Sequence, residues 1–151
     1  IPLPPPVVAG SKAPVFSAKD MGGITYQMRH DATRPTLLQF WAAWCPHCRA
    51  DLPLIKELFA KYGDKQLHLL TVSIDQDLRA LKTFLQDQHV LFPVIAEFDP
   101  THPQQFSLSE LYEVHGVHAY FLIDAQGVIV KTWAGSMTES QGDLEEMLAQ
   151  K

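Results

Sequence analysis

Residues 36–59 read TLLQFWAAWCPHCRADLPLIKELF. The first six form an apolar run as long as a buried strand, and apolar residues recur at helical spacing after Cys48. Cys45 therefore stands where a strand gives way to a helix. Unpaired backbone N–H groups and the helix dipole stabilise negative charge at a helix N-terminus, so this position favours the thiolate of Cys45. Pro46 suits the first helical turn, because its missing N–H would have no intrahelical partner.

Cys45 and Cys48 are the only cysteines of the chain, and two residues separate them. Such a pair can be half of a zinc site, a structural disulfide or a redox-active pair. Zinc normally takes four ligands, and the sequence contains no second cysteine pair and no HxxxH pair. A disulfide that closes so short a loop restricts the unfolded chain little. The context therefore favours a redox pair, which needs no cofactor.

His47 lies between the two cysteines and directly follows Pro46. An imidazole beside the nucleophile can donate a hydrogen bond or positive charge to the Cys45 thiolate, which lowers the pKa of a thiol and makes the disulfide more oxidising. We therefore expect Pro46 and His47 to tune the pKa of the pair. The alternative is that His47 is an exposed loop residue without a role.

Length and composition indicate one domain with a real core, since the chain has 151 residues and 46% apolar content. The net charge is −5 and the basic residues are dispersed, so we expect no nucleic-acid partner. Residues 1–10 are rich in proline and predict an extended linker, followed by a single domain over residues 11–151. The chain opens at Ile1 without an initiator Met, and we expect a mature or truncated form that is a monomer.

Hydrophobic patterns predict an α/β fold with strands and helices in alternation. They indicate an N-terminal hairpin over 15–28, strands over 36–41, 67–74 and 92–95, a C-terminal hairpin over 120–133, and helices over 46–62, 77–88, 107–113 and 138–150. Strands that alternate with helices before a final hairpin are typical of a mixed sheet covered on both faces.

The segment FWAAWCPHCR, residues 40–49, resembles the active-site signature of the thioredoxin superfamily. Residues 10–16, 112–117, 121–127 and 134–138 are similar to its TlpA/ResA/DsbE-like branch of extracytoplasmic thiol–disulfide proteins. The resemblance implies a thioredoxin-like fold and disulfide exchange with protein thiols and disulfides. It also implies a periplasmic or other extracytoplasmic location, a membrane anchor in an N-terminal segment absent here, and a membrane or periplasmic redox partner.

In this arrangement Cys45 is the exposed nucleophile, and Cys48 lies deeper and resolves the mixed disulfide. Asp51 follows Cys48 by three residues, at a position where the branch often has a carboxylate. By this resemblance Asp51 tunes proton transfer to the cysteines, unless it is simply an exposed helical carboxylate. Gln39 occupies the place of a buried aspartate in thioredoxins proper, and its neutral amide cannot accept a proton.

Two tryptophans flank the cysteine pair. Trp41 and Trp44 can form an apolar rim that meets partner side chains. The alternative for Trp41 is ordinary packing in the core.

His118 stands where thioredoxin-like proteins carry a cis-proline on the loop that faces the cysteine pair, so Val117 and His118 belong to the expected substrate-facing loop together with Trp44. We consider three interpretations. His118 is a tolerated replacement and exchange persists; Cys45, Cys48 and His118 bind a soft metal such as Cu(I); or His118 points to solvent without a role.

The sequence thus predicts a thiol–disulfide oxidoreductase that uses the motif over residues 45–48. The alternative is a copper-binding module that uses the same cysteines, and a third option is a redox-inert binding domain. The Pro46-His47 dipeptide is typical of the strongly oxidising DsbA type, whereas the TlpA/ResA/DsbE-like branch implies a reductant.

Overall fold

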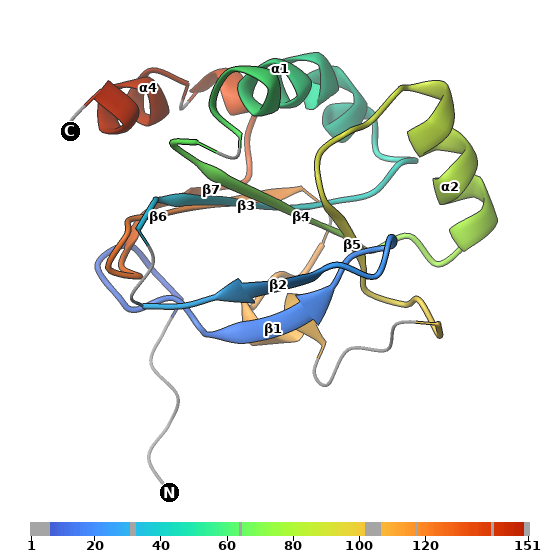
Figure 1. Cartoon of the computed structure of the whole chain (residues 1–151), viewed down its shortest axis with the longest axis horizontal. Coiled ribbons are helices and arrows are strands. Elements are labelled where there is room, and N and C mark those ends of the chain that lie inside the picture. Colours follow the sequence, from blue (N-terminus) through green and yellow to red (C-terminus); the bar gives the residue numbers. More distant parts are fainter. Residues whose placement is uncertain are drawn as a thin grey trace, which may run out of the picture.

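A five-stranded mixed sheet lies at the centre of the computed structural model (Figure 1). The structure describes residues 7–30, 33–63, 65–101, 107–116, 118–139 and 141–149. Its elements are, in chain order, β1 (Phe16–Lys19), β2 (Thr25–Met28), β3 (Thr36–Trp41), α1 (Pro46–Tyr62), β4 (His68–Ser73), α2 (Leu78–Asp87), β5 (Val94–Ala96), α3 (Leu108–Leu111), β6 (Ala119–Ile123), β7 (Ile129–Trp133), the 3₁₀ helix η1 (Met137–Glu139) and α4 (Gln141–Ala149).

Strand β3 occupies the middle of the sheet, whose order is β5-β4-β3-β6-β7. It pairs in parallel with β4 and antiparallel with β6, and all six of its residues are buried. Successive side chains of a strand point to opposite faces, so Leu37 packs on one side of the sheet while Leu38 and Phe40 pack on the other. A strand buried on both faces carries the continuous apolar run that the sequence shows.

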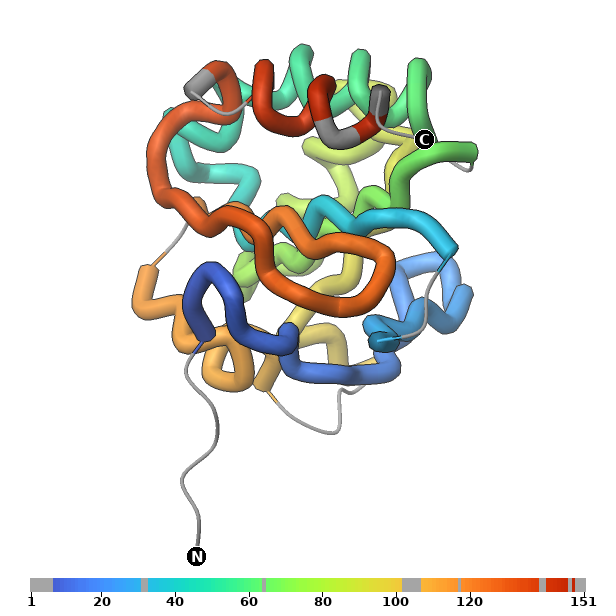
Figure 2. The backbone as a smooth tube through the Cα atoms, turned by 90° about the vertical axis from the view of Figure 1, so that its left-hand side faces the viewer, coloured from blue at the N-terminus to red at the C-terminus, as the bar shows by residue number. Residues whose placement is uncertain are grey.

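Helices α1, α2 and α4 cover one face of the sheet (Figure 1). Asp77 begins α2 by accepting a hydrogen bond from the backbone N–H of Ala80 at 3.1 Å, as its position in the sequence predicts. Figure 2 shows α4 beside α1, and the buried side chains Leu144 and Leu148 of α4 belong to the same core cluster as Ile55 of α1. The predicted last helix is divided between η1 and α4.

The β1–β2 hairpin and α3 cover the opposite face (Figure 1). Tyr112 packs there against the rings of Phe16, Phe40 and Phe121, with ring centroids 5.1–5.9 Å apart. These contacts join the hairpin and the sheet through one aromatic group. The predicted α/β fold, with a central mixed sheet and an N-terminal hairpin, is confirmed.

Residues 7–10 lie against the domain. The N–H of Gly10 donates a hydrogen bond to the carbonyl of Ile129 at 2.7 Å, and the N–H of Val7 donates to the Glu113 carboxylate at 3.3 Å. Residues 1–6 lie outside the described part of the chain, so the predicted linker over residues 1–10 stays a prediction.

Candidate active site: a dithiol at the start of α1

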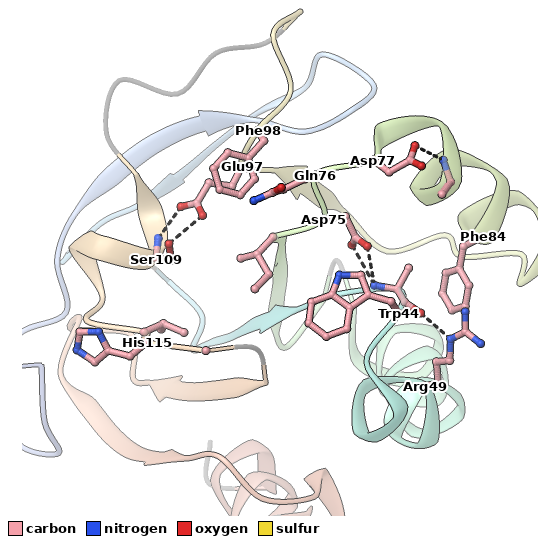
Figure 3. Close-up of a pocket in the computed structure, with 15 residues that line it drawn as sticks. Trp44, Arg49, Asp75, Gln76, Asp77, Phe84, Glu97, Phe98, Ser109 and His115 are labelled. Atoms are coloured by element: carbon pink, nitrogen blue, oxygen red, sulfur yellow. Dashed lines mark hydrogen bonds between the residues drawn. The ribbon is translucent and has the colours of Figure 1, made fainter.

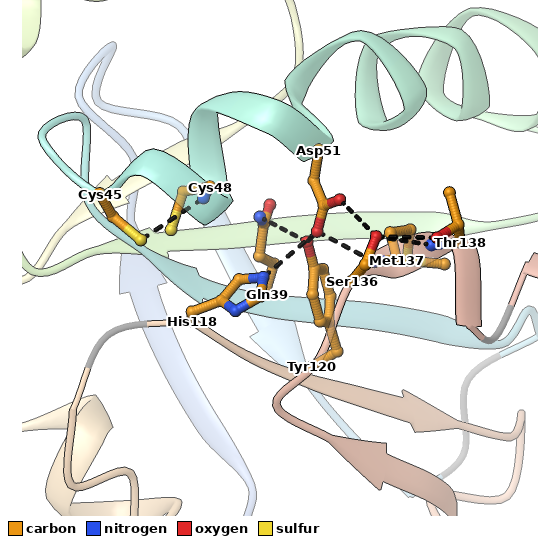
Figure 4. Close-up of polar contacts among 9 residues, drawn as sticks. All are labelled: Gln39, Cys45, Cys48, Asp51, His118, Tyr120, Ser136, Met137 and Thr138. Atoms are coloured by element: carbon orange, nitrogen blue, oxygen red, sulfur yellow. Dashed lines mark hydrogen bonds and ion pairs between the residues drawn. The ribbon is translucent and has the colours of Figure 1, made fainter.

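Cys45 caps the N-terminus of α1, as the strand-to-helix pattern predicts. Its backbone is extended (φ −80°, ψ 121°), and its Sγ accepts a hydrogen bond from the backbone N–H of Cys48 at 3.4 Å (Figure 4). Pro46 follows in the first helical turn. Both cysteines are free thiols, so the structure represents the dithiol form. The sulfur of Cys45 therefore lies at the positive end of the helix dipole, where a thiolate is stabilised.

Both cysteines are buried, each with 2% of its surface exposed. The expectation that Cys45 is exposed and only Cys48 lies deeper is therefore wrong for this conformation. The reason is that β3 leads directly into the loop over 42–44, which keeps Cys45 inside the core cluster on the helix side of the sheet. The surface around the pair is formed by exposed neighbours, namely Trp44, Pro46 and His47.

The two tryptophans differ in their surroundings. Trp41 is 2% exposed and packs between Phe84 and Phe92, so core packing is its role in the fold. Trp44 is 60% exposed directly before Cys45. An exposed indole beside a reactive sulfur offers contact area to a partner.

The environment of Cys48 disfavours its thiolate. Burial raises the pKa of the Cys48 thiol well above its ordinary value. The hydrogen bond with Cys45 and the negative charges of Cys45 and Asp51 raise this pKa further, against a lowering by the backbone hydrogen bond with Ala42. Cys48 is therefore protonated at neutral pH.

Asp51 is buried one helical turn after Cys48, with 4% of its surface exposed. Its carboxylate accepts four hydrogen bonds: from the Tyr120 hydroxyl (2.6 Å), the Met137 N–H (3.0 Å), the Ser136 hydroxyl (3.0 Å) and Nε2 of His118 (3.2 Å) (Figure 4). Burial by itself raises the pKa of Asp51, but these bonds outweigh it and lower the pKa below its ordinary value. The interpretation as an exposed helical carboxylate is wrong.

His118 lies inside this network. Its side chain is buried, and Nε2 donates to the ionised Asp51, because a carboxylate can only accept (Figure 4). The imidazole stacks on the ring of His47, with centroids 5.7 Å apart and planes 17° apart. The interpretation that His118 points to solvent is therefore wrong. Val117 lies outside the described residues, and so does the peptide bond that joins it to His118.

The backbone of His118 also differs from what a proline would give. Its φ is +84°, in the left-handed region, and its N–H donates to the carbonyl of Phe40 at 3.1 Å. Proline has a φ near −65° and no N–H. Histidine therefore adds one hydrogen bond to the pairing between the end of β3 and the start of β6.

The arrangement does not favour the copper-binding alternative. Within the described ranges, no group of three or more His, Cys, Asp or Glu side chains is placed to hold a metal ion. The Nε2 atom of His118 is directed at Asp51. Cys45, Cys48 and His118 therefore do not form the three-ligand set that this alternative requires.

Gln39 and Tyr120 extend the network into the sheet. The Gln39 amide donates to the Tyr120 hydroxyl at 3.2 Å, and that hydroxyl donates to Asp51 (Figure 4). Sequence reasoning missed Tyr120 and Ser136 as partners of Asp51. Side chains two residues apart on a strand point to the same face, so the expected position of His118 near the site could have indicated that Tyr120 lies there too. Ser136 requires the tertiary fold, because it is 85 residues from Asp51.

The loop before Cys45 borders a cavity of about 780 Å³ (Figure 3). Trp44 and Arg49 form one wall, and Glu97, Phe98 and His115 lie opposite. Two charged side chains at this cavity, Asp75 and Arg49, bond to the backbone of Ala43. Sequence reasoning did not identify either residue.

A mixed sheet whose central strand leads into a helix that begins with a cysteine pair defines the class of thioredoxin-like proteins. The chain belongs to the Redoxin family, whose model matches residues 8–149. The predicted resemblance to the ResA- and DsbE-like branch is confirmed by its relatives.

Two of these relatives are named thiol-disulfide oxidoreductase ResA. The protein from Bacillus thuringiensis subsp. konkukian (strain 97-27) is 28% identical over 139 residues, which are 92% of this chain and 76% of the relative. The protein from Bacillus subtilis (strain 168) is 27% identical over 131 residues, which are 87% of this chain and 70% of the relative.

Solved structures show the same fold. A candidate thiol:disulfide interchange protein DsbE from Chlorobium tepidum has a TM-score of 0.75 and 27% identity, over 93% of this chain and 96% of that one. StoA from Bacillus subtilis has a TM-score of 0.72 and 22% identity, over 93% of this chain and 99% of StoA.

Proposed function

We propose that this protein is a thiol–disulfide oxidoreductase that exchanges disulfides with other proteins through Cys45 and Cys48. The observation that carries the proposal is the placement of Cys45 as the N-cap of α1, with its sulfur bonded to the N–H of Cys48. A thiolate in that position is stabilised by the helix and has its second thiol one turn away. The ResA relatives support the same activity.

In the reducing direction, the Cys45 thiolate attacks one sulfur of a substrate disulfide, forming a mixed disulfide and releasing one substrate thiolate. The Cys48 thiol then loses its proton, and its sulfur attacks Cys45. The bond between Cys45 and the substrate breaks, the Cys45–Cys48 disulfide forms, and the electron pair leaves on the second substrate sulfur, which takes up a proton. The substrate is reduced by two electrons and the dithiol is oxidised by two; the opposite direction reverses each step.

The charges around Cys48 give these steps an order. Before the first attack, the charge of Cys45 contributes to the raised pKa of Cys48 and keeps it protonated. Once Cys45 is bound in the mixed disulfide, that charge is gone and the pKa of Cys48 falls. We propose that Asp51 acts on Cys48 through its charge, since four donors already occupy its carboxylate and leave it a weak proton acceptor.

Other residues near the pair receive roles in the same proposal. Pro46 and His47 tune the pKa of Cys45, and Trp44, Val117 and His118 face the substrate. The exposure of Trp44 and the stacking of His47 on His118 support these assignments. Because Cys45 is 2% exposed, contact with a protein substrate requires these neighbours to move aside.

We also propose an extracytoplasmic location, an N-terminal membrane anchor and a membrane or periplasmic redox partner, with the protein itself a monomer. Among the solved structures of the same fold is a secreted disulfide oxidoreductase of Mycobacterium tuberculosis, 20% identical with a TM-score of 0.68. None of the helices in the described part of the chain combines the length and apolar character that a membrane crossing requires.

Trapping experiments test the function. With a protein substrate that contains a disulfide, the Cys48→Ser variant accumulates a mixed disulfide through Cys45, and the Cys45→Ser variant does not. The equilibrium constant of the wild-type pair against glutathione then gives its reduction potential and assigns the direction of electron flow. Absence of any mixed disulfide in Cys48→Ser, together with failure of the wild-type protein to equilibrate with glutathione, would refute the proposal.

A further inference from the structure

We propose that Asp75 and Arg49 are positioning residues for Cys45, which hold the backbone of Ala43 from two sides and thereby fix the sulfur at the start of α1. The inference rests on the proposed function, since it assigns further residues to the same exchange reaction. Both side chains come from outside the loop over 42–44 and reach it from different elements (Figure 3).

Asp75 holds the N–H of Ala43. This N–H lies 2.9 Å from Oδ2 and 3.1 Å from Oδ1 of the carboxylate, and Oδ2 also accepts from the hydroxyl of Ser73 at 2.5 Å. Asp75 is itself fixed, because its N–H donates to the Ser73 hydroxyl at 3.0 Å. Since Ser73 ends β4, the loop before Cys45 is tied to the strand beside β3.

Arg49 holds the carbonyl of Ala43. Its Nε donates to that oxygen at 2.5 Å, and its guanidinium lies over the ring of Phe84, 5.1 Å from the centroid. Arg49 stands in the first turns of α1, so the helix that carries the cysteines is tied back to the loop that precedes it. The backbone N–H and the carbonyl of Ala43 therefore both bond to charged side chains, and such hydrogen bonds are stronger than neutral ones.

The burial of Asp75 indicates that these bonds matter. The side chain is 4% exposed, and no ion pair among the described residues includes it. A buried carboxylate without a cation is unfavourable unless hydrogen bonds compensate for its lost hydration. The groups that donate to Asp75 are the N–H of Ala43 and the hydroxyl of Ser73, so the loop that Asp75 holds also stabilises the buried carboxylate.

The consequence for the reaction follows from the geometry of Cys45. Its sulfur meets the N–H of Cys48 only while the Cys45 backbone is extended at the helix start, two residues after Ala43. A loosened loop exchanges that conformation for others in which the helix does not stabilise the thiolate. The dithiol form then loses stability relative to the disulfide, and the glutathione equilibrium moves toward the disulfide.

The test compares equilibrium constants against glutathione in four proteins: wild type, Asp75→Asn, Asp75→Ala and Arg49→Lys. Asn removes the charge but keeps an oxygen for the Ala43 N–H, whereas Ala removes both. We expect Ala to favour the disulfide at least tenfold more than Asn does, which corresponds to about 30 mV for this two-electron couple. Lys keeps the charge of Arg49 but lacks Nε, and we expect a shift of at least threefold in the same direction.

Asp20→Ala is the matched control. Asp20 is 8% exposed and, like Asp75, accepts hydrogen bonds from backbone: the N–H groups of Gly22 and Ile24 donate to it, each at 2.9 Å, in the β1–β2 turn. The Asp20→Ala variant also loses stability, because backbone N–H groups lose their carboxylate partner. Asp20 lies outside the site, so the equilibrium constant of this variant against glutathione stays within twofold of wild type. Equal constants for Asp75→Ala and Asp75→Asn, with Arg49→Lys unchanged, would overturn the inference.

Three further outcomes are decisive. If Asp75→Ala does not fold, Arg49→Lys carries the test alone, because Arg49 is exposed and a threefold shift in that variant supports the inference while an unchanged constant contradicts it. In the double variant Asp75→Ala/Arg49→Lys, the two shifts of the equilibrium constant are less than additive, because both substitutions act through Ala43. If the wild-type protein does not exchange with glutathione, the proposed function is refuted. That outcome differs from failure of the present inference, in which the wild type exchanges and the variants do not shift.

Discussion

Replacement of Asp51 by Asn removes the buried charge beside Cys48 and leaves the shape of the side chain. The carboxylate accepts three donors at Oδ2 and one at Oδ1. Asn can present its oxygen to the three donors and its amide to the Ser136 hydroxyl, which can accept. The variant is therefore expected to fold, with neutral hydrogen bonds in place of charge-assisted ones.

The expected loss follows from that exchange of bond types. Hydrogen bonds to charged groups contribute about 1.5–3 kcal/mol each and neutral ones about 0.5–1.5 kcal/mol. Part of the difference is offset, since a neutral amide loses less hydration on burial than a carboxylate does. We expect Asp51→Asn to lower the free energy of unfolding at pH 7 by about 2 kcal/mol.

The loss depends on pH in a defined direction. The pKa of Asp51 is lower in the folded protein than its ordinary value, so its ionised form stabilises the fold above the pKa of an unfolded aspartate, about 3.9. That contribution disappears as the pH falls through the folded pKa. The difference between wild type and Asp51→Asn is therefore largest at neutral pH and shrinks below about pH 4.

Urea unfolding of the reduced proteins, followed by tryptophan fluorescence at pH 7 and pH 3, measures both effects. Asp87→Asn serves as the control for a lost surface charge at the end of α2, with a change within about 0.5 kcal/mol. Other carboxylates are common to wild type and variant, so the difference isolates Asp51. Equal stabilities at pH 7, or a difference that does not shrink at pH 3, would show that the carboxylate does not hold this network.

Three further predictions concern single residues. His118→Pro lowers the free energy of unfolding by at least about 2 kcal/mol more than His118→Gly, because proline cannot adopt a φ of +84° or donate to Phe40, and denaturation of both variants decides this. His47→Ala raises the pH midpoint of Cys45 alkylation by iodoacetamide if the imidazole stabilises the thiolate; an unchanged profile contradicts that role. Ile55→Ala removes a fully buried side chain of α1 and costs about 2–5 kcal/mol, measured by the same unfolding assay, and a loss below about 1 kcal/mol contradicts the assigned packing.

The local elements and the cysteine site could be predicted from the sequence, because they depend on short-range patterns. The apolar run over 36–41 specifies a strand buried on both faces, and the helix after it begins at the only cysteine pair. The reason is that strand burial, helix capping and the first-turn proline are settled by residues a few positions apart.

The partners of Asp51 were decided only by the tertiary structure. Helical spacing left its carboxylate either exposed or near the cysteines, and the fold instead buried it among donors that lie 67–86 residues away in the chain. The same holds for Asp75, which bonds to Ala43 across 32 residues. Such contacts arise where the ends of β3 and β4, the start of β6 and the start of η1 meet α1, and no local pattern encodes which polar groups face each other there.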